Sequence, residues 1–304
     1  PVDPAADADP ADAAALLRRV QAEAHGDDAL ADALRAAPGV VLAFHVGERG
    51  QDPEAAKLGR GRYGQVVPGP ALPVPGERVL ASLPRFNQLA SRLGAMTTFT
   101  DASGSVREVP LALGLGSSVY APLAVQLVAE AEGVPRGEVA FLGEGGDVHV
   151  GERIIAGPRL WLRWRGAPFQ VVSVADLVAG QVPDLRGRIG ILGFDHLAQD
   201  AVRTPFGVRP GYEVHATAVD NLLRGDPLRR SGPAVDAALT LLAGLLAVAG
   251  FLGARPAARI AVAGGVGTST LLGLQLAFAQ GWWVSAVGPV AAVAAATAAA
   301  TVAS

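Results

Sequence analysis

The chain has 304 residues, of which 50% are apolar and 17% are charged, with a net charge of -3 and a mean hydropathy of +0.34. This composition is too apolar for an ordinary water-soluble protein, and it lacks the clustered Lys and Arg that nucleic-acid binding requires. The absence of cysteine excludes disulfides, thiolate metal sites and cysteine nucleophiles. Because the chain begins at Pro1 without a basic and apolar leader, we interpret it as a fragment of a longer protein.

The first part of the chain predicts a lead-in followed by a folded domain. Residues 1–24 are rich in Ala, Asp and Pro, which indicates a flexible segment that runs into a short helix. The next stretch has leucines at helical spacing and stops at Pro38-Gly39. The apolar, β-branched run at 40–46 is typical of a strand buried in a sheet.

Residues 47–84 are rich in Gly, Pro and charge, and they indicate a long irregular excursion. The sequence GRGRYG at 59–64 matches the GxGxxG fingerprint of nucleotide-binding proteins. It neither follows a strand pattern nor opens a helix, so we do not interpret it as a nucleotide site.

Helix and strand patterns alternate along the next part of the chain. Helical patterns cover residues 86–94, 121–134, 173–180 and 211–225. Strand patterns cover residues 95–100, 138–143, 147–151, 159–166 and 187–194, and the end of 101–116. Ser173 is the expected N-cap of its helix and Gly180 the residue that ends it. The alternation predicts one α/β domain over residues 25–230.

From Ala234 onward the chain contains three apolar stretches, each about 20 residues long, the length with which a helix crosses about 30 Å of hydrocarbon. The stretches are residues 234–254, 260–279 and 283–304. A bundle of buried helices in a soluble protein would keep a polar face, which these stretches lack. We therefore expect three transmembrane helices, with Trp282 and Trp283 at the membrane interface.

The arginines that flank the first apolar stretch predict its orientation. Arg255 and Arg259 lie in a short loop and indicate that this loop faces the cytoplasm. Arg224, Arg229 and Arg230, on the other side, argue for the opposite orientation. Large domains cross membranes largely regardless of charge, so the short loop carries more weight. We predict a multi-pass protein of the inner (plasma) membrane with an extracytoplasmic α/β domain over residues 1–230.

The stretch GRIGILGFDHLAQDAVRTPFGVRPGYEVHATAVDNLLRG resembles the signature of the CHASE domain, type two, an extracytoplasmic sensory module of bacterial signalling proteins. The family pattern has a G-K-I-V-L-I-G strand, an Asp, T-P, P-G-V-x-I-H-A and a helix reading N-x-L-L-x-G. The matching positions are 187–193, Asp200, Thr204-Pro205, Pro210-Gly211, Val214-His215-Ala216 and 221–225.

Weaker similarities lie upstream of this signature. Residues 27–34 are similar to the D-x-x-L-A-x-A-L helix of the family. Asp101, Gly104 and Arg107 resemble its D-x-D-G-x-x-R-x-x-P-L turn, in which the second Asp is missing here. The resemblance implies three spans after the domain and then a cytoplasmic cyclase, histidine kinase or Ser/Thr kinase. It also implies an anchor, a strand and a helix before it, so that the N-terminal part of the sensor fold is missing.

His215, which follows a Pro-Gly turn, and Asp200, upstream of it, have two interpretations. They could bind a ligand or metal in a pocket at the strand ends, where open α/β sheets bind ligands. Alternatively, His215 holds the turn by a hydrogen bond to a neighbouring loop. Asp195 and His196 could join them in a metal cluster, but the spacing matches no established metal motif. We expect neither a metal nor a cofactor.

Thr204 belongs to a rigid Thr-Pro turn, and Arg107 could either clamp an anionic ligand or pair with Asp101 across its own turn. The candidate ligand-binding residues are therefore Asp200, Thr204, His215 and Arg107. No GxSxG, HExxH or P-loop motif is present, and we expect no catalytic residue in this segment.

Three hypotheses about function follow. The first is an extracytoplasmic sensory input module that binds an unknown small molecule or protein, contacts membrane lipid, forms a homodimer and signals through its transmembrane helices. The second is a membrane-anchored enzyme with a site around Asp200 and His215. The third is an envelope scaffold protein, which would show an exposed apolar patch.

Overall fold

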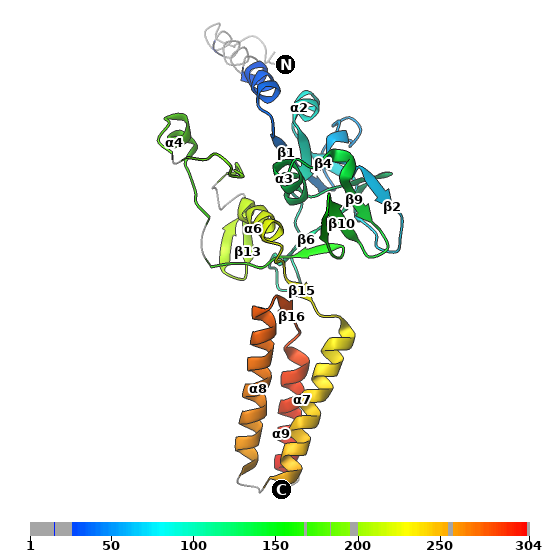
Figure 1. The fold of residues 1–304 in the computed structure, drawn as a ribbon, viewed down its shortest axis with the longest axis vertical. Helices are drawn as coiled ribbons and strands as arrows, with labels where there is room; N and C mark the ends of the chain where they lie inside the picture. Colours follow the sequence, from blue (N-terminus) through cyan, green and yellow to red (C-terminus); the bar gives the residue numbers. More distant parts are fainter. Residues whose placement is uncertain are drawn as a thin grey trace, which may run out of the picture. The chain divides into compact units, whose positions relative to one another are not determined.

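The computed structural model describes residue 15 and residues 26–166, 169–182, 184–194, 200–254 and 258–302 (Figure 1). The chain divides into two compact units. The first unit comprises residues 1–159 and 169–219, and the second comprises residues 160–168 and 220–304.

The first unit is mixed α/β and contains several small sheets in place of one large sheet. Residues 26–36 form its first described helix. The further helices are α2 (Pro84–Leu89), α3 (Leu123–Ala131), α4 (Val174–Val178) and most of α6 (Gly211–Arg224), with short 3-10 turns η1 (Gly59–Gly61) and η2 (Arg136–Glu138). The strands that begin in it are β1 (Val41–Gly47), β2 (Gln65–Val67), β3 (Val74–Gly76), β4 (Arg78–Leu80), β5 (Arg92–Ala95), β6 (Glu108–Pro110), β7 (Leu113–Leu115), β8 (Ser118–Tyr120), β9 (Val139–Leu142), β10 (Asp147–Val150), β11 (Arg153–Ile155), β12 (Arg159–Trp161), β13 (Ala201–Thr204) and β14 (Gly207–Pro210).

Strand β1 lies at the centre of the sheet that contains the main core. It pairs antiparallel with β4 and parallel with β5, in the order β4-β1-β5. Two further sheets have the orders β11-β10-β9-β2 and β3-β7-β8, and β13 and β14 form an antiparallel hairpin. The observed β1 confirms the strand predicted from the apolar run at 40–46.

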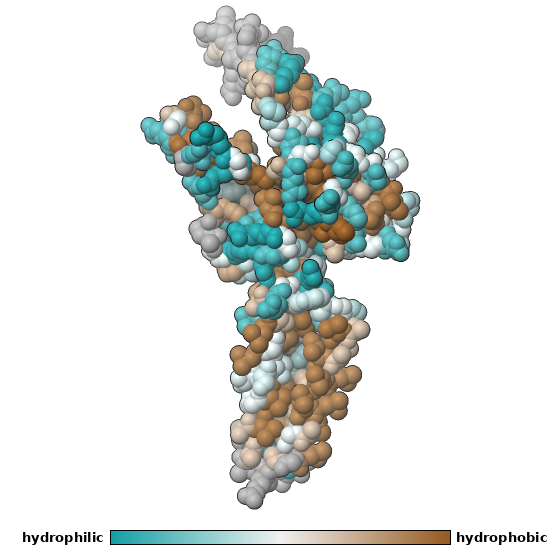
Figure 2. Space-filling model, in the orientation of Figure 1, coloured by the Kyte–Doolittle hydropathy of each residue, from teal (hydrophilic) through white to brown (hydrophobic). Residues whose placement is uncertain are grey.

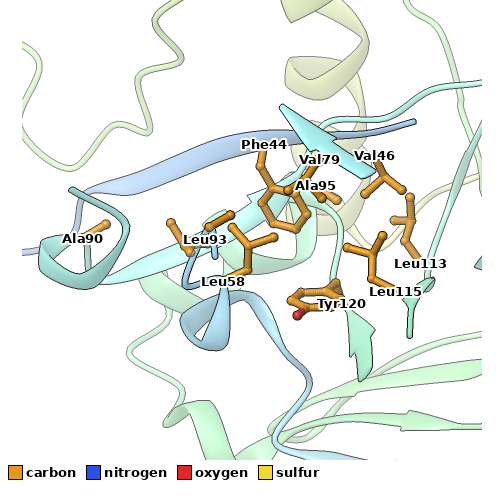
Figure 3. Close-up of a cluster of buried hydrophobic side chains, with 11 residues drawn as sticks. Phe44, Val46, Leu58, Val79, Ala90, Leu93, Ala95, Leu113, Leu115 and Tyr120 are labelled. Atoms are coloured by element: carbon orange, nitrogen blue, oxygen red, sulfur yellow. The ribbon is translucent and has the colours of Figure 1, made fainter. Parts of the chain in front are cut away.

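Large apolar side chains fill the core of the first unit (Figure 3). The rings of Phe44 and Tyr120 meet edge to face with centroids 5.7 Å apart. Leu58, Val79 and Leu93 surround them and are almost fully buried. Burial of such side chains is the main favourable contribution to folding in water.

Two of the predicted strands are wrong. Residues 187–194 form no strand; Leu192 and Phe194 are 83% and 86% exposed. The β-branched pattern was right for a strand, but a strand also needs a neighbouring edge with which to pair, and pattern alone does not supply one. Residues 95–100 leave the sheet after Ala95, because β5 lies earlier, at 92–95, within the stretch predicted as helix.

Helices α4 and α6 agree with the sequence patterns. The Ser173 hydroxyl accepts a hydrogen bond from the Ala175 N–H at 3.2 Å, and Gly180 has the left-handed φ of 69° that ends such a helix. Helix α6 runs unbroken over the predicted HATAVDNLLR segment.

The second unit contains strands β15 (Arg229–Arg230) and β16 (Trp282–Trp283) and helices α7 (Pro233–Gly253), α8 (Arg259–Ala279) and α9 (Val287–Val302). Two helices are long and apolar enough to cross a membrane, over Pro233–Leu252 and Ala261–Ala279. Helix α9 is apolar but has 16 described residues, so two of the three expected spans reach the length of a bilayer-crossing helix. Figure 2 shows that their visible surface is largely apolar.

Small residues lie between these helices. Ala243, Ala247, Phe251 and Val293 form the buried cluster of the bundle. An added Cβ at Gly288 of α9 would overlap the Thr240 hydroxyl of α7, so glycine is required for this close approach. Packing through small residues is typical of helices that associate in lipid.

Candidate functional site

The hairpin β13–β14 contains the predicted site residue Thr204 and leads directly into helix α6, which contains His215. Thr204 forms the hairpin turn: its hydroxyl donates to the Gly207 carbonyl at 2.8 Å and accepts from the Phe206 N–H at 3.2 Å. Gly207 has a φ of 98°, which glycine adopts without strain. Thr204 is therefore a structural residue of the turn in this state of the molecule.

Asp200 lies against the first residue of helix α6. A Cβ at Gly211 would overlap the Asp200 carboxylate, so the glycine permits this approach. The first N–H groups of a helix have no partner within the helix and favour a nearby negative charge. The carboxylate is exposed, and its place at this helix end leaves it open to solvent or a ligand.

His215 lies one turn into the same helix and is 6% exposed. It forms a hydrogen bond with the backbone of Met96, which supports the prediction that it holds a neighbouring loop. Its Nδ1 is buried and has no hydrogen-bond partner among the described residues. Burial lowers the pKa of His215 to about 4, so its imidazole is neutral at physiological pH. A neutral imidazole with Nδ1 unpaired presents a buried hydrogen-bonding group that is not satisfied by the surrounding chain.

Arg107 lies in a different turn and is held there by Asp101, which is the pairing that the sequence left open. The Asp101 carboxylate also accepts from the Ser103 hydroxyl at 2.6 Å and from the Ser105 N–H at 3.2 Å. The Ser103 hydroxyl, the backbone N–H groups and Arg107 hold the pKa of Asp101 well below its usual range. The Val106 N–H donates to the Arg203 carbonyl at 2.8 Å, which joins this turn to strand β13.

The structure brings together only part of the predicted set. Asp200 lies against the first residue of α6 and His215 lies one turn into that helix, whereas the side chains of Thr204 and Arg107 are engaged in their own turns. Asp195 and His196 lie outside the described residues. In the described ranges, no group of three or more His, Cys, Asp or Glu side chains could hold a metal ion.

The second unit contains a polar cluster that the sequence did not predict. Arg163 and Asn221 form two hydrogen bonds: the Arg163 N–H donates to Asn221 Oδ1 at 2.7 Å, and Asn221 Nδ2 donates to the Arg163 carbonyl at 3.1 Å. Asn221 is fully buried and begins the stretch Asn-Leu-Leu-Arg-Gly at the end of α6. The Arg163 guanidinium donates to the Phe278 and Ala279 carbonyls at 3.2 and 3.0 Å, at the C-terminus of α8.

Carboxylates complete this cluster. Arg165 forms ion pairs with Asp220 and Asp226, and Arg163 lies 3.4 Å from Asp226. Sequence reasoning assigned these arginines to an alternating strand, but β12 ends at Trp161. The sequence signal for this cluster was the run of tryptophans and arginines at 161–165.

Next to this cluster is a set of aromatic and basic side chains, which we call the Arg–Trp platform. It consists of Trp161, Arg229, Arg230, Trp282 and Trp283. Strands β15 and β16 pair in parallel and place Arg229 beside Trp282 and Arg230 beside Trp283. The indoles of Trp161 and Trp283 stack at 4.8 Å between centroids.

No curated protein and no solved structure matches the chain significantly. The sequence model of the CHASE2 domain matches residues 4–252, most of the chain, including the hairpin, helix α6 and nearly all of helix α7. CHASE2 is an extracytoplasmic sensory domain of signalling proteins. The chain belongs to the CHASE2 domain family.

Proposed function

We propose that this chain is the input module of a membrane-bound bacterial signal-transduction protein, with the α/β domain outside the plasma membrane and α7–α9 as a multi-pass anchor that carries the signal inward. Membership of the CHASE2 family and the two helices of membrane-spanning length support the proposal. The shorter α9 would be the third span. A cyclase, histidine kinase or Ser/Thr kinase would follow as output.

The observation that carries the proposal is the course of helix α6. Residues 211–219 of this helix belong to the first unit and residues 220–224 to the second. Its first turns contain His215, and its last turns contain Asn221. Asn221 is hydrogen-bonded to Arg163. The Arg163 guanidinium in turn donates to a carbonyl at the end of α8. A displacement of the helix by ligand binding would thus reach a membrane helix through hydrogen-bonded groups.

A ligand can shift such a system only if it binds one of two packings more tightly. We propose that the ligand acts at the start of α6, where Asp200 and the unpaired Nδ1 of His215 lie. Thr204 and Arg107 would contribute only after leaving their present hydrogen bonds. The ligand would be a small molecule or protein that offers a hydrogen-bond donor to Nδ1.

The homodimer is also a proposal, supported by the outer face of α8. Gln275 is exposed there and has no hydrogen-bond partner among the described residues. Gly264 and Gly265 on the same helix have open space around them. An amide is both donor and acceptor, so two copies of Gln275 would satisfy each other in lipid, where an unpaired amide is unfavourable.

The enzyme hypothesis receives less support. A general base works best with a pKa near the operating pH, and the pKa of His215 is lowered to about 4.

Topology labelling tests the proposal. The chain has no cysteine, so single cysteines at Ser117, exposed in the first unit, and at Ala258, next to α8, can be labelled in intact cells with an impermeant thiol reagent. We expect labelling of Ser117→Cys alone, and labelling of both variants once the cells are lysed. Labelling of Ala258→Cys alone in intact cells would place the domain in the cytoplasm and refute the sensory input proposal.

A further inference from the structure

Two arginines next to the membrane helices have no carboxylate partner among the described residues. The second unit contains three carboxylates, and each has other partners: Asp220 and Asp226 pair with Arg163, Arg165 and Arg224. Asp236 accepts from the Ser231 hydroxyl at 2.5 Å and from the Ser285 N–H at 3.3 Å. Arg229 and Arg230 are exposed, and no described carboxylate pairs with them.

The indoles of the Arg–Trp platform hold both guanidinium groups. The Arg229 guanidinium carbon lies 5.9 Å from the Trp282 ring centroid. The Arg230 guanidinium carbon lies 5.3 Å from the Trp161 ring and 5.2 Å from the Trp283 ring. An aromatic ring contacts the face or end of a guanidinium without using its N–H donors as a carboxylate would, so these donors remain available to an anion.

The chain itself places the Arg–Trp platform at the membrane surface. The first candidate span begins at Pro233, shortly after β15, and the second ends at Ala279, shortly before β16. Both strands therefore lie at the same end of the helices (Figure 1). Indole rings at this level are typical of the interface between water and hydrocarbon.

We propose that the Arg–Trp platform is a binding site for the headgroup phosphate of an anionic phospholipid. A guanidinium matches the oxygens of a phosphate with two parallel hydrogen bonds. Two guanidinium groups against one phosphodiester leave an excess of positive charge, which favours an anionic lipid over a zwitterionic one. At the end of two membrane helices, headgroup phosphates are in contact with the arginines, whereas free phosphate must arrive from solution.

The test compares variants of the whole chain in nanodiscs of phosphatidylcholine with increasing fractions of phosphatidylglycerol, with retained lipid measured by native mass spectrometry. Replacement of both arginines by Gln should weaken retention of phosphatidylglycerol by at least about tenfold, because two charge-assisted contacts are lost. The matched control is Arg224→Gln, which removes one positive charge from the same unit. The Arg224 side chain is 61% exposed and is paired with Asp220. This control should retain phosphatidylglycerol as the unchanged protein does.

Two further arms separate the alternatives. A variant with Lys at positions 229 and 230 keeps both charges but lacks the paired N–H donors of guanidinium, and should lose part of the preference for phosphatidylglycerol. This comparison also holds if the Gln variant does not fold. Inorganic phosphate added to the nanodiscs should leave lipid retention unchanged. Displacement of the lipid by phosphate, or equal losses in the Gln variant and the Arg224→Gln control, would overturn the proposal.

Discussion

The two units of the chain differ in where their large apolar side chains lie. In the first unit the aromatic and branched residues, such as Phe44 and Tyr120, are inside. In the second unit alanines such as Ala247 are inside, while Leu241 and Leu245 of α7 are 67% and 66% exposed. Water drives large apolar groups inward, whereas lipid is as apolar as leucine and leaves close packing of small residues to hold helices together. The contrast indicates which solvent each unit meets.

The distribution of polar groups follows the same contrast. In the first unit, ion pairs such as Arg107–Asp101 and Arg159–Glu108 are scattered over turns and strands. In the second unit, the described ion pairs all involve Asp220 or Asp226, outside the candidate spans. The ion pairs of the second unit are thus kept out of the apolar segments, where lipid would not solvate them.

The largest effect is expected from truncation of the first unit's core. Phe44→Ala should lower the free energy of unfolding by about 3–5 kcal/mol, because it removes a buried ring that packs on Tyr120. Chemical denaturation followed by circular dichroism measures this. Leu72→Ala, at a side chain 78% exposed, serves as the control and should change it little. Equal losses in both variants would show that the first unit lacks the core described here.

A charge on the outer surface of α7 tests the lipid environment directly. Leu245→Arg should disfavour membrane insertion by about 3 kcal/mol, because arginine in the middle of a span is far less favourable than leucine. The fraction of chain recovered in the membrane is the measurement. The same substitution at Leu72 in the first unit should be nearly neutral. A neutral Leu245→Arg would mean that α7 does not face lipid.

The buried histidine makes the first unit sensitive to acid. The pKa of His215 is about 4 in the folded chain and 6.5 ordinarily, so between these values the unfolded chain binds a proton that the folded chain does not. Its contribution is fully present above pH 6.5 and falls by about 3 kcal/mol as the pH drops to about 4. Urea unfolding at several pH values measures this slope. His215→Gln should flatten it, and an unchanged slope would assign the effect to other groups.

The smallest effect concerns the close approach of α7 and α9. Gly288→Ala places a Cβ on the Thr240 hydroxyl and should destabilise the bundle by about 1–3 kcal/mol. Thermal unfolding in detergent measures this. Gly273→Ala in α8 has open space around it and should not destabilise the bundle. If both variants behave alike, the two helices are not packed through Gly288.

The elements predicted best were those fixed by local chemistry. Ser173 caps α4 by its own hydroxyl, and α6 follows from a Pro-Gly start and a helical apolar pattern. The apolar stretches predicted α7 and α8, since helix length and hydropathy are properties of the sequence alone. The GxGxxG match at 59–64, which we did not interpret as a nucleotide site, folds in part as the 3-10 turn η1.

The elements predicted worst depend on a partner far away in the chain. Residues 187–194 have a strand pattern but no strand in the structure, because pairing is decided by the neighbour and not by the segment. The candidate site shows the same division. The motif made Asp200 and His215 candidates, which stay a prediction, but nothing local indicated that Arg163 would bond to Asn221, 58 residues later.

The sequence by itself determined that the chain combines an α/β domain with apolar helices, and it marked the residues at the start of α6, because periodicity, capping and hydropathy act within a few residues. Only the tertiary structure decided that His215 is buried with an unpaired Nδ1, that Arg163 reaches the end of α8, and that Arg229 and Arg230 lie on indoles without a described carboxylate partner. Burial and ion pairing depend on which segments meet in space, and that is settled by the whole chain at once.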